Sequence, residues 1–272
     1  MATFAYVGPS LETSNINDAL LARHLDPKRV GSIKKFRDSA AALGGPISRD
    51  KLWFFASFRE GVTQQYAEGL YFNKLTQPQS LLYEPDLSRP VSSNDYSRDV
   101  SVRFTWQAAQ KHKIVLMHSM QPNCNCGFNL LNPGARRTPE ATGEHHYDPH
   151  YLSSASWTNP VTSRILLEAG TTIYVINQND KREPGFPETN IQITDQGLNL
   201  IYGNIPTRTL PRRQYLNRFA VSRVTASHTV KAGVTVQAGP HRRYRQASVM
   251  TSGCTTVRST TAFGVACPTS SR

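Results

Sequence analysis

The stretch Gly44–Phe55, GGPISRDKLWFF, decides the fold class of this chain. Gly44, Gly45 and Pro46 predict a tight turn, because glycine and proline are the strongest local turn formers. The charged residues that follow, including Asp50 and Lys51, are typical of a boundary with water. Residues 52–55 are all large and apolar, which predicts a strand with two apolar faces. The stretch therefore indicates a β protein in which a turn leads into an aromatic strand.

Beyond this stretch, apolar and polar residues alternate with a period of two. The clearest case is Asp99–Ala108, whose even-numbered residues are apolar and whose odd-numbered residues are polar. Residues 230–238 repeat the pattern, whereas 163–175 alternate less cleanly because Leu166 and Tyr174 fall on the polar side. A one-sided apolar strand of about ten residues is typical of a tilted membrane-spanning strand. Strands of soluble sandwiches tend toward about 5–6 residues.

The predicted links between strands come in two sizes. Residues 110–113 and 227–228 are short hairpin links, whereas residues 65–95, 122–150 and 178–212 are long and irregular. This alternation is typical of outer-membrane barrels, with tight turns on one side and long loops on the other. Aromatic residues gather near the predicted strand ends, as in interfacial girdles, although a core rich in aromatic residues is the alternative. They are Trp53, Phe54, Phe55, Phe58, Tyr71, Phe72, Tyr147, Tyr151 and Trp157.

The composition narrows the class of protein. The chain has 272 residues and a formal net charge of +12, but its basic residues are scattered in short pairs. No basic helix face and no nucleic-acid motif is present in the sequence, so we expect no nucleic-acid partner. The positive net charge fits a protein whose basic interior or rim faces anionic lipid or an anionic substrate. No apolar stretch reaches the roughly 18 residues of a membrane helix, and the first residues lack the pattern of a secretory signal.

Cys124 and Cys126 form a Cys-Asn-Cys motif in a predicted polar loop. A single Cys-x-Cys lacks the second ligand pair of a structural zinc site. An oxidising compartment would permit a local disulfide between the two, and two unpaired thiols are the alternative. Cys254 and Cys267 lie in the atypical C-terminal part of the chain.

Residues 144–150, EHHYDPH, are the one cluster in the sequence that resembles a ligand set. His145, His146, Asp148 and His150 are weak candidates for binding a transition metal, and an ordinary polar loop is the simpler interpretation. The sequence has no nucleophile elbow and no phosphate-binding loop. We therefore expect no catalytic residue, no cofactor and no enzyme activity.

Five segments in order resemble the TonB-dependent outer-membrane receptors of the Oar-like type. They are the GGPISRDKLWFFASFRE stretch, RFTWQAAQKHKIVLMHSMQPNCNC, a Thr-Pro-Glu-Ala element, SSASWTNPVTSRILLEAGTTIY and VTASHTVKAGVTVQAG. In the last of these, Ala226 stands where the family has glycine. The resemblance covers about residues 11–245.

The resemblance implies a plugged outer-membrane β-barrel of about 22 strands, energised through TonB, that imports a ligand. This chain would supply roughly the first eight to ten strands, so we expect a fragment. Residues 1–43 would end the plug region and residues 44–246 would form the partial barrel. The junction would lie at Gly44, Gly45, Pro46, Asp50 and Lys51. Residues 247–272 lose the alternation and would be a disordered or frame-shifted tail.

The implied location is the outer membrane, and the implied partners are its lipid, the TonB complex of the full-length protein and an unknown imported ligand. Two other classes stay open: a soluble β-rich carbohydrate-binding module and, less favoured, a secreted β-sandwich hydrolase. The apolar strand faces separate the classes. A transporter exposes these faces to lipid, whereas a soluble domain buries them beneath a second sheet.

Overall fold

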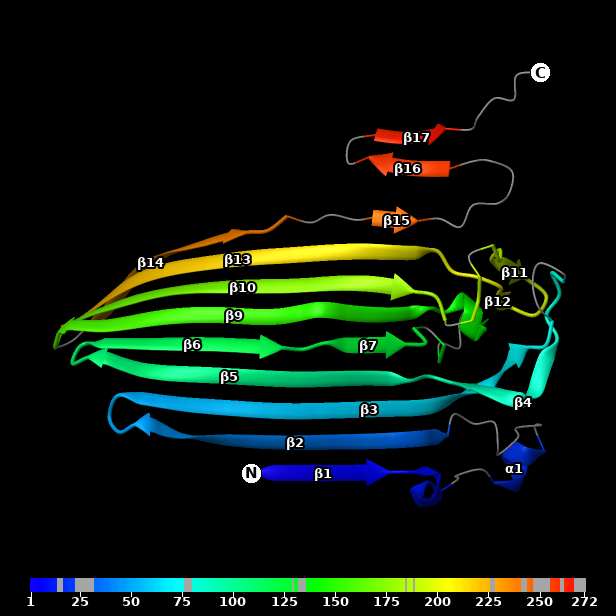
Figure 1. Cartoon of the computed structure of the whole chain (residues 1–272), viewed down its shortest axis with the longest axis horizontal. Helices are drawn as coiled ribbons and strands as arrows, with labels where there is room; N and C mark the ends of the chain where they lie inside the picture. Colours follow the sequence, from blue (N-terminus) through cyan, green and yellow to red (C-terminus); the bar gives the residue numbers. More distant parts are fainter. Residues whose placement is uncertain are drawn as a thin grey trace.

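The computed structural model describes residues 1–13, 17–22, 32–75, 80–128, 130–131, 136–183, 185–187, 189–225, 228–240, 244–246, 255–259 and 262–266. In these residues the protein is all-β, and most of its strands join one large antiparallel sheet (Figure 1). The expected all-β, antiparallel fold class is therefore confirmed.

Nine strands follow one another across this sheet in the order β1-β2-β3-β5-β6-β9-β10-β13-β14. Neighbours in this order are neighbours in the chain apart from short strands in the connecting segments. The strands are β1 (Ala2–Val7), β2 (Ile33–Ser48), β3 (Leu52–Asn73), β5 (Asp95–Ala109), β6 (His112–Met120), β9 (Glu144–Thr162), β10 (Ile165–Lys181), β13 (Thr207–Val224) and β14 (Thr229–Ala238). Several exceed the expected ten residues, because the segments expected to be loops begin and end as strand.

The two ends of the sheet differ, as the short and long links predict (Figure 1). Tight turns join β2 to β3, β5 to β6, β9 to β10 and β13 to β14 at what we name the turn end. The longer links gather at the opposite end, which we name the loop end. They carry β4 (Pro85–Ser92), β7 (Asn123–Cys126), β8 (Arg136–Arg137), the 3-10 helix η2 (Pro139–Ala141), β11 (Ile193–Asp195) and β12 (Leu200–Tyr202). The expected loops are therefore partly ordered by strand pairing.

The bend expected at Gly44–Pro46 lies elsewhere. These residues are inside β2, where Gly44 pairs with Phe55 and Pro46 with Trp53. The chain turns at residues 49–51, where Asp50 has a φ of 63° and the Lys51 amide donates to the Ser48 carbonyl at 3.1 Å. Aspartate tolerates this left-handed conformation, so the charged residues make the turn.

Gly44 has a different role from the one its sequence context predicts. A Cβ atom at Gly44 would lie 2.8 Å from the backbone oxygen of Phe54, whereas one at Gly45 would meet nothing within 4 Å. Glycine at position 44 therefore permits the close approach of β2 and β3. A glycine inside a strand often marks such a close backbone contact.

The first 43 residues contribute to the same sheet as the residues that follow. β1 pairs with β2 in an antiparallel register from Ala2↔Ala41 to Val7↔Phe36. Between them lie the 3-10 helix η1 (Pro9–Leu11) and the single helical turn α1 (Asp18–Leu21). The expected boundary between residues 43 and 44 thus falls within β2.

After β14, the described part of the tail is also β. β15 (Tyr244–Gln246) pairs with β13, while β16 (Thr255–Ser259) and β17 (Ala262–Ala266) pair with each other in a separate two-stranded sheet. Cys254, Cys267 and the remaining tail residues lie outside the described residues. Among the described residues, no helix is long and apolar enough to cross a membrane.

The compact apolar core of the described residues lies at the loop end. Ala67 and Leu70 of β3 pack there with Val91 of β4 and with Leu200 and Tyr202 of β12. The Tyr83 and Tyr202 rings lie 5.7 Å apart between centroids beside this core. The rest of the sheet is a single layer, so its long strands are not buried between two layers.

Candidate functional site: an apolar sheet face and a polar loop end

One face of the large sheet is predominantly apolar across its nine strands, and we name it the apolar face; its polar residues include His118 and Ser153, which share a hydrogen bond at 2.7 Å, together with Thr171 and Asn217. Directly opposed residues of an antiparallel pair share a face, so the register places its side chains together. A row across its centre runs from Phe54 to Phe104 to Leu116 to Ala155. Other apolar residues of this face are Phe4, Leu43, Leu52, Phe58, Val100, Val102, Trp106, Ile114, Trp157, Leu167, Ile173, Phe219, Val221, Val230, Val234 and Val236.

Many of these side chains are exposed. Val230 is 64% exposed, Val234 is 60% exposed, and Phe104 and Trp106 are also exposed. In the described part of the chain, the long strands form one continuous sheet, and no second sheet is drawn over it in Figure 1. Soluble monomers rarely leave a contiguous apolar surface of this extent uncovered. An exposed apolar surface of this kind is typical of a face that contacts lipid or another protein.

Polar and amphipathic groups mark both borders of the apolar face. Toward the loop end, Arg37 and Arg98 both form ion pairs with Glu60, the Arg98 Nη2 atom at 2.7 Å from Glu60 Oε1. Toward the turn end, the Trp157 indole N–H donates to His112 Nδ1 at 3.1 Å. Between these borders the apolar run on β10 spans roughly 33 Å, at about 3.3 Å per residue from Ile165 to Val175.

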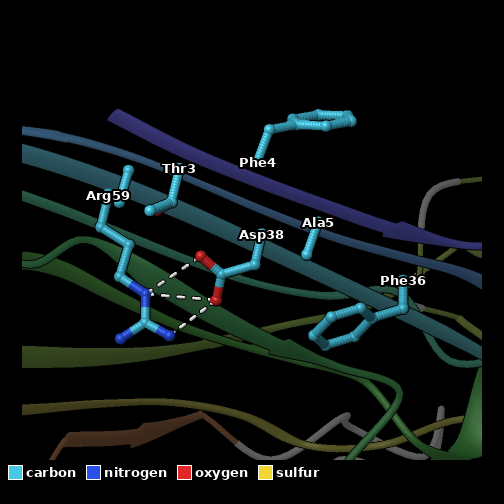
Figure 2. Close-up of a pocket in the computed structure, with 7 residues that line it drawn as sticks. Thr3, Phe4, Ala5, Phe36, Asp38 and Arg59 are labelled. Carbon is cyan, nitrogen blue, oxygen red and sulfur yellow. Dashed lines mark hydrogen bonds and ion pairs between the residues drawn. The ribbon is translucent and has the colours of Figure 1, made fainter. Parts of the chain in front are cut away.

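The opposite face is polar, and we name it the polar face. Ser57 and Ser101 share a hydrogen bond at 2.6 Å between β3 and β5, and Lys231 of β14 forms an ion pair with Glu168 of β10. Near β1, Arg59 donates hydrogen bonds to both carboxylate oxygens of Asp38, which is the ion pair drawn in Figure 2. That pair lines a shallow, open depression of about 480 Å³. The depression is open to solvent and is lined by few residues, so it lacks the enclosure of a ligand pocket.

At the loop end, the polar face carries a buried cluster of ionisable groups. His145 of β9 and Asp180 of β10 are opposed in the register and are 3% and 7% exposed. Asp180 accepts a hydrogen bond from Arg208 of β13, and His145 Nε2 lies 3.6 Å from Asp180 Oδ1. The Phe128 ring stacks on the His145 imidazole with centroids 4.1 Å apart. Three strands and one loop therefore converge on this cluster.

The electrostatics of this cluster favour a neutral histidine. Burial lowers the pKa of His145, which outweighs the opposite effect of Asp180, and the charge of Arg208 lowers that pKa further. The ion pair within the cluster is thus formed by Arg208 and Asp180. This leaves His145 as a neutral hydrogen-bonding group that contacts Gln178 through Nδ1 at 3.4 Å.

Glu140 is a second buried ionisable group at the loop end. It lies in η2, is 2% exposed, and its Oε2 atom has no hydrogen-bond partner. Burial raises the pKa of this carboxyl group above its usual range, while neighbouring hydrogen-bond donors, among them the Gly203 backbone, act in the opposite direction. The Thr-Pro-Glu-Ala element singled out in the sequence therefore places its glutamate in the interior.

The expected disulfide is present. Cys124 and Cys126 are bonded to each other within β7, so the alternative of two unpaired thiols is wrong. Both side chains are buried, and β7 pairs with β5 on one side and β9 on the other.

The four candidate metal ligands of residues 144–150 do not come together. Because they lie on a strand, neighbouring residues point to opposite faces. His145 lies in the buried cluster. His146 is opposite Cys124 in the register, and its Nε2 atom lies 2.7 Å from Glu144 Oε2. His150 contacts Asn123 and Tyr174 instead, and Asp148 is exposed. The potential ligand group of the described residues is Cys124, Cys126 and His146.

Sequence reasoning missed the groups that depend on cross-strand register. Asp180 and Arg208 join His145, and Glu60 joins Arg37 and Arg98, over separations of more than twenty residues. A signal was available for Glu60 alone among the acidic groups, because it interrupts the apolar side of β3 formed by Ala56, Phe58 and Val62.

No protein-family model matches the chain, and no curated protein or solved structure shows significant similarity to it. The fold and the geometry of the site define an all-β protein with one large antiparallel sheet, an uncovered, predominantly apolar face and a structured polar loop end.

Proposed function

We propose that the chain is part of a TonB-dependent outer-membrane receptor of the Oar-like type. Its large sheet would be a section of the transmembrane β-barrel wall, with the apolar face toward lipid and the polar face toward the lumen. The observation that carries this proposal is the uncovered apolar face, which continues across nine strands and ends at polar borders.

The dimensions of the sheet support this orientation. A spanning strand needs about 9–11 residues at a tilt near 45°, and the apolar runs on β10 and β14 reach this length. The arrangement of Trp157 and Tyr151 on the apolar face, near opposite borders, matches the interfacial aromatic girdles of such barrels. In Figure 1 the tight turns would be periplasmic and the loop end external.

The ordered loop end supports a binding role on the external side. Long external loops in this class of barrel determine the ligand, and here they hold a buried polar cluster around His145 together with Glu140. The polar face below would line the route of an imported ligand. The described sheet has open edges at β1 and β14, so additional strands are required to close the wall.

A soluble β-rich carbohydrate-binding module is the second candidate. The serines and ion pairs of the polar face favour it as a polar surface for a glycan. It would need another protein layer on the apolar face, and it predicts a monodisperse chain in water without detergent.

Paired quenching measurements in detergent micelles test the orientation. A single cysteine would be introduced at Phe104 or at Thr105, which are neighbours on opposite faces of β5, and labelled with a fluorophore. Cys254→Ser and Cys267→Ser would remove other thiols, since Cys124 and Cys126 are bonded. We expect a spin-labelled fatty acid to quench position 104 and iodide to quench position 105.

The state of the chain in buffer without detergent distinguishes the soluble module from the barrel wall. A chain that is monodisperse in buffer, with position 104 shielded from both quenchers, has a protein layer over the apolar face. That result would reject the barrel-wall proposal and favour the soluble module.

A further inference from the structure

The ladder between β7 and β9 holds four potential metal ligands in a two-by-two array. Cys124 opposes His146 and Cys126 opposes Glu144. Directly opposed residues share a face of the ladder, and so do residues two apart on one strand. All four side chains therefore point to the same side, although the sequence separates the two pairs by about twenty residues.

The ligand atoms are already close together. One atom from each of Cys124, Cys126 and His146 lies within 4.8 Å of the others. The Cys124 Sγ atom is 3.8 Å from His146 Nε2, and Glu144 Oε2 is 2.7 Å from the same nitrogen. In a tetrahedral zinc site with bonds of about 2.0–2.3 Å, neighbouring ligand atoms are separated by similar distances.

The disulfide in this array contributes little to the stability of the fold. It joins residues two apart in sequence, and the entropy that a cross-link removes from the unfolded chain decreases with the length of the closed loop. The surrounding ladder is held independently by backbone pairing of β7 with β5 and β9. Reduction of the bond would therefore leave the two sulfur atoms on the same strand, facing His146 and Glu144.

We propose that this array is a redox-gated site for a thiophilic metal ion such as Zn²⁺. A dithiol reductant supplies two electrons and two protons and is itself oxidised to a disulfide; a phosphine supplies the two electrons and becomes its oxide, while water supplies the two protons and the oxygen. Either reductant converts the disulfide into the Cys124 and Cys126 thiols. Metal binding then releases the two thiol protons, and the two thiolates, His146 Nε2 and the Glu144 carboxylate become the ligands. In the oxidised chain the sulfur atoms are bonded to each other and the site is closed. This inference does not depend on the proposed transport function.

Cobalt titration of the full chain tests the site, because Co²⁺ reports thiolate ligation and tetrahedral geometry by its absorbance. The chain would carry Cys254→Ser and Cys267→Ser, so that its two thiols come from the array. We expect the phosphine-reduced chain to bind one Co²⁺ with a thiolate charge-transfer band and tetrahedral visible bands. Zn²⁺ would remove both signals, and the oxidised chain would give neither.

Two ligand variants and one control make the test specific. His146→Ala should weaken Co²⁺ binding at least about tenfold, and Glu144→Gln should weaken it while altering the visible bands, since both remove a proposed ligand. His150→Ala is the control: it alters a histidine of the same strand that contacts Asn123 and Tyr174, and it should leave the affinity unchanged.

Alkylation supplies a second readout that does not depend on spectra. Zn²⁺ should protect both thiols of the reduced chain from iodoacetamide, and this protection should be lost in His146→Ala. A reduced chain that retains its β-sheet circular dichroism but binds no Co²⁺ would overturn the proposal. Binding that is equal in His146→Ala and His150→Ala would overturn it as well.

Discussion

At the scale of single residues, burial determines which charge His145 carries. The side chain is almost fully buried and contacts Phe128, Gln178 and Asp180, and burial lowers its pKa from the usual value of 6.5. The unfolded chain therefore binds the proton more readily than the folded one. The resulting stability is fully present above pH 6.5 and is lost as the pH falls toward the folded pKa.

The corresponding prediction concerns the pH dependence of stability. Between pH 7.5 and pH 5, the free energy of unfolding should fall more in the wild-type chain than in His145→Gln, which cannot be protonated. Denaturant titrations at the two pH values measure this difference. His228→Gln, which changes an exposed histidine of the β13–β14 link, should behave like wild type. A His145→Gln variant as acid-sensitive as wild type would contradict the assignment.

A pair of adjacent glycines provides a second residue-scale test. At Gly44 a methyl group would be forced against the Phe54 backbone oxygen, whereas at Gly45 it would enter open space. We expect Gly44→Ala to destabilise the fold by about 1–3 kcal/mol, as overpacking does. We expect Gly45→Ala to be neutral or stabilising by up to about 1 kcal/mol, because alanine restricts the unfolded chain. Unfolding midpoints in denaturant would measure both, and equal effects would refute the close approach of β2 and β3.

At the scale of elements, neighbouring positions of β10 should differ sharply in their tolerance of charge. Ile173 lies on the apolar face and Thr172 on the polar face, and both are β-branched residues. If the apolar face contacts lipid, Ile173→Arg should cost about 2–4 kcal/mol, the cost of arginine near the centre of a bilayer. Thr172→Arg should cost much less. Recovery of folded protein in detergent micelles would measure this, and equal recovery would argue against a lipid-facing strand.

The elements that could be predicted from sequence are those fixed by local alternation. Val100–Trp106 and Val230–Val236 reveal their apolar side directly. The short links expected at residues 110–113 and 227–228 follow from where that alternation stops, close to the observed ends of β5 and β13 at Ala109 and Val224. The turn at Asp50 was misplaced because Gly44 and Pro46 are stronger turn signals than Asp50, although the glycine is needed for strand contact. The His146, Glu144 and Cys124 array could not be predicted, since it depends on the register between β7 and β9.

At the scale of the whole molecule, the sheet is open along two strands. Among the described residues, β1 pairs with β2 alone and β14 with β13 alone. Each outer edge presents backbone N–H and C=O groups without strand partners. In water such groups are solvated, but in the apolar interior of a bilayer each unsatisfied group costs several kcal/mol.

This openness predicts that the 272-residue chain does not insert by itself as a stable transmembrane sheet. Directed to the outer membrane by an added signal peptide, it should yield no heat-modifiable, membrane-integrated species in semi-native electrophoresis. A closed barrel expressed in the same cells is the control for export and assembly. Insertion should be rescued when strands that pair with β1 and β14 are supplied on the same polypeptide. A stably integrated, heat-modifiable product of the chain alone would mean that its edges are satisfied in another way, such as by pairing between copies.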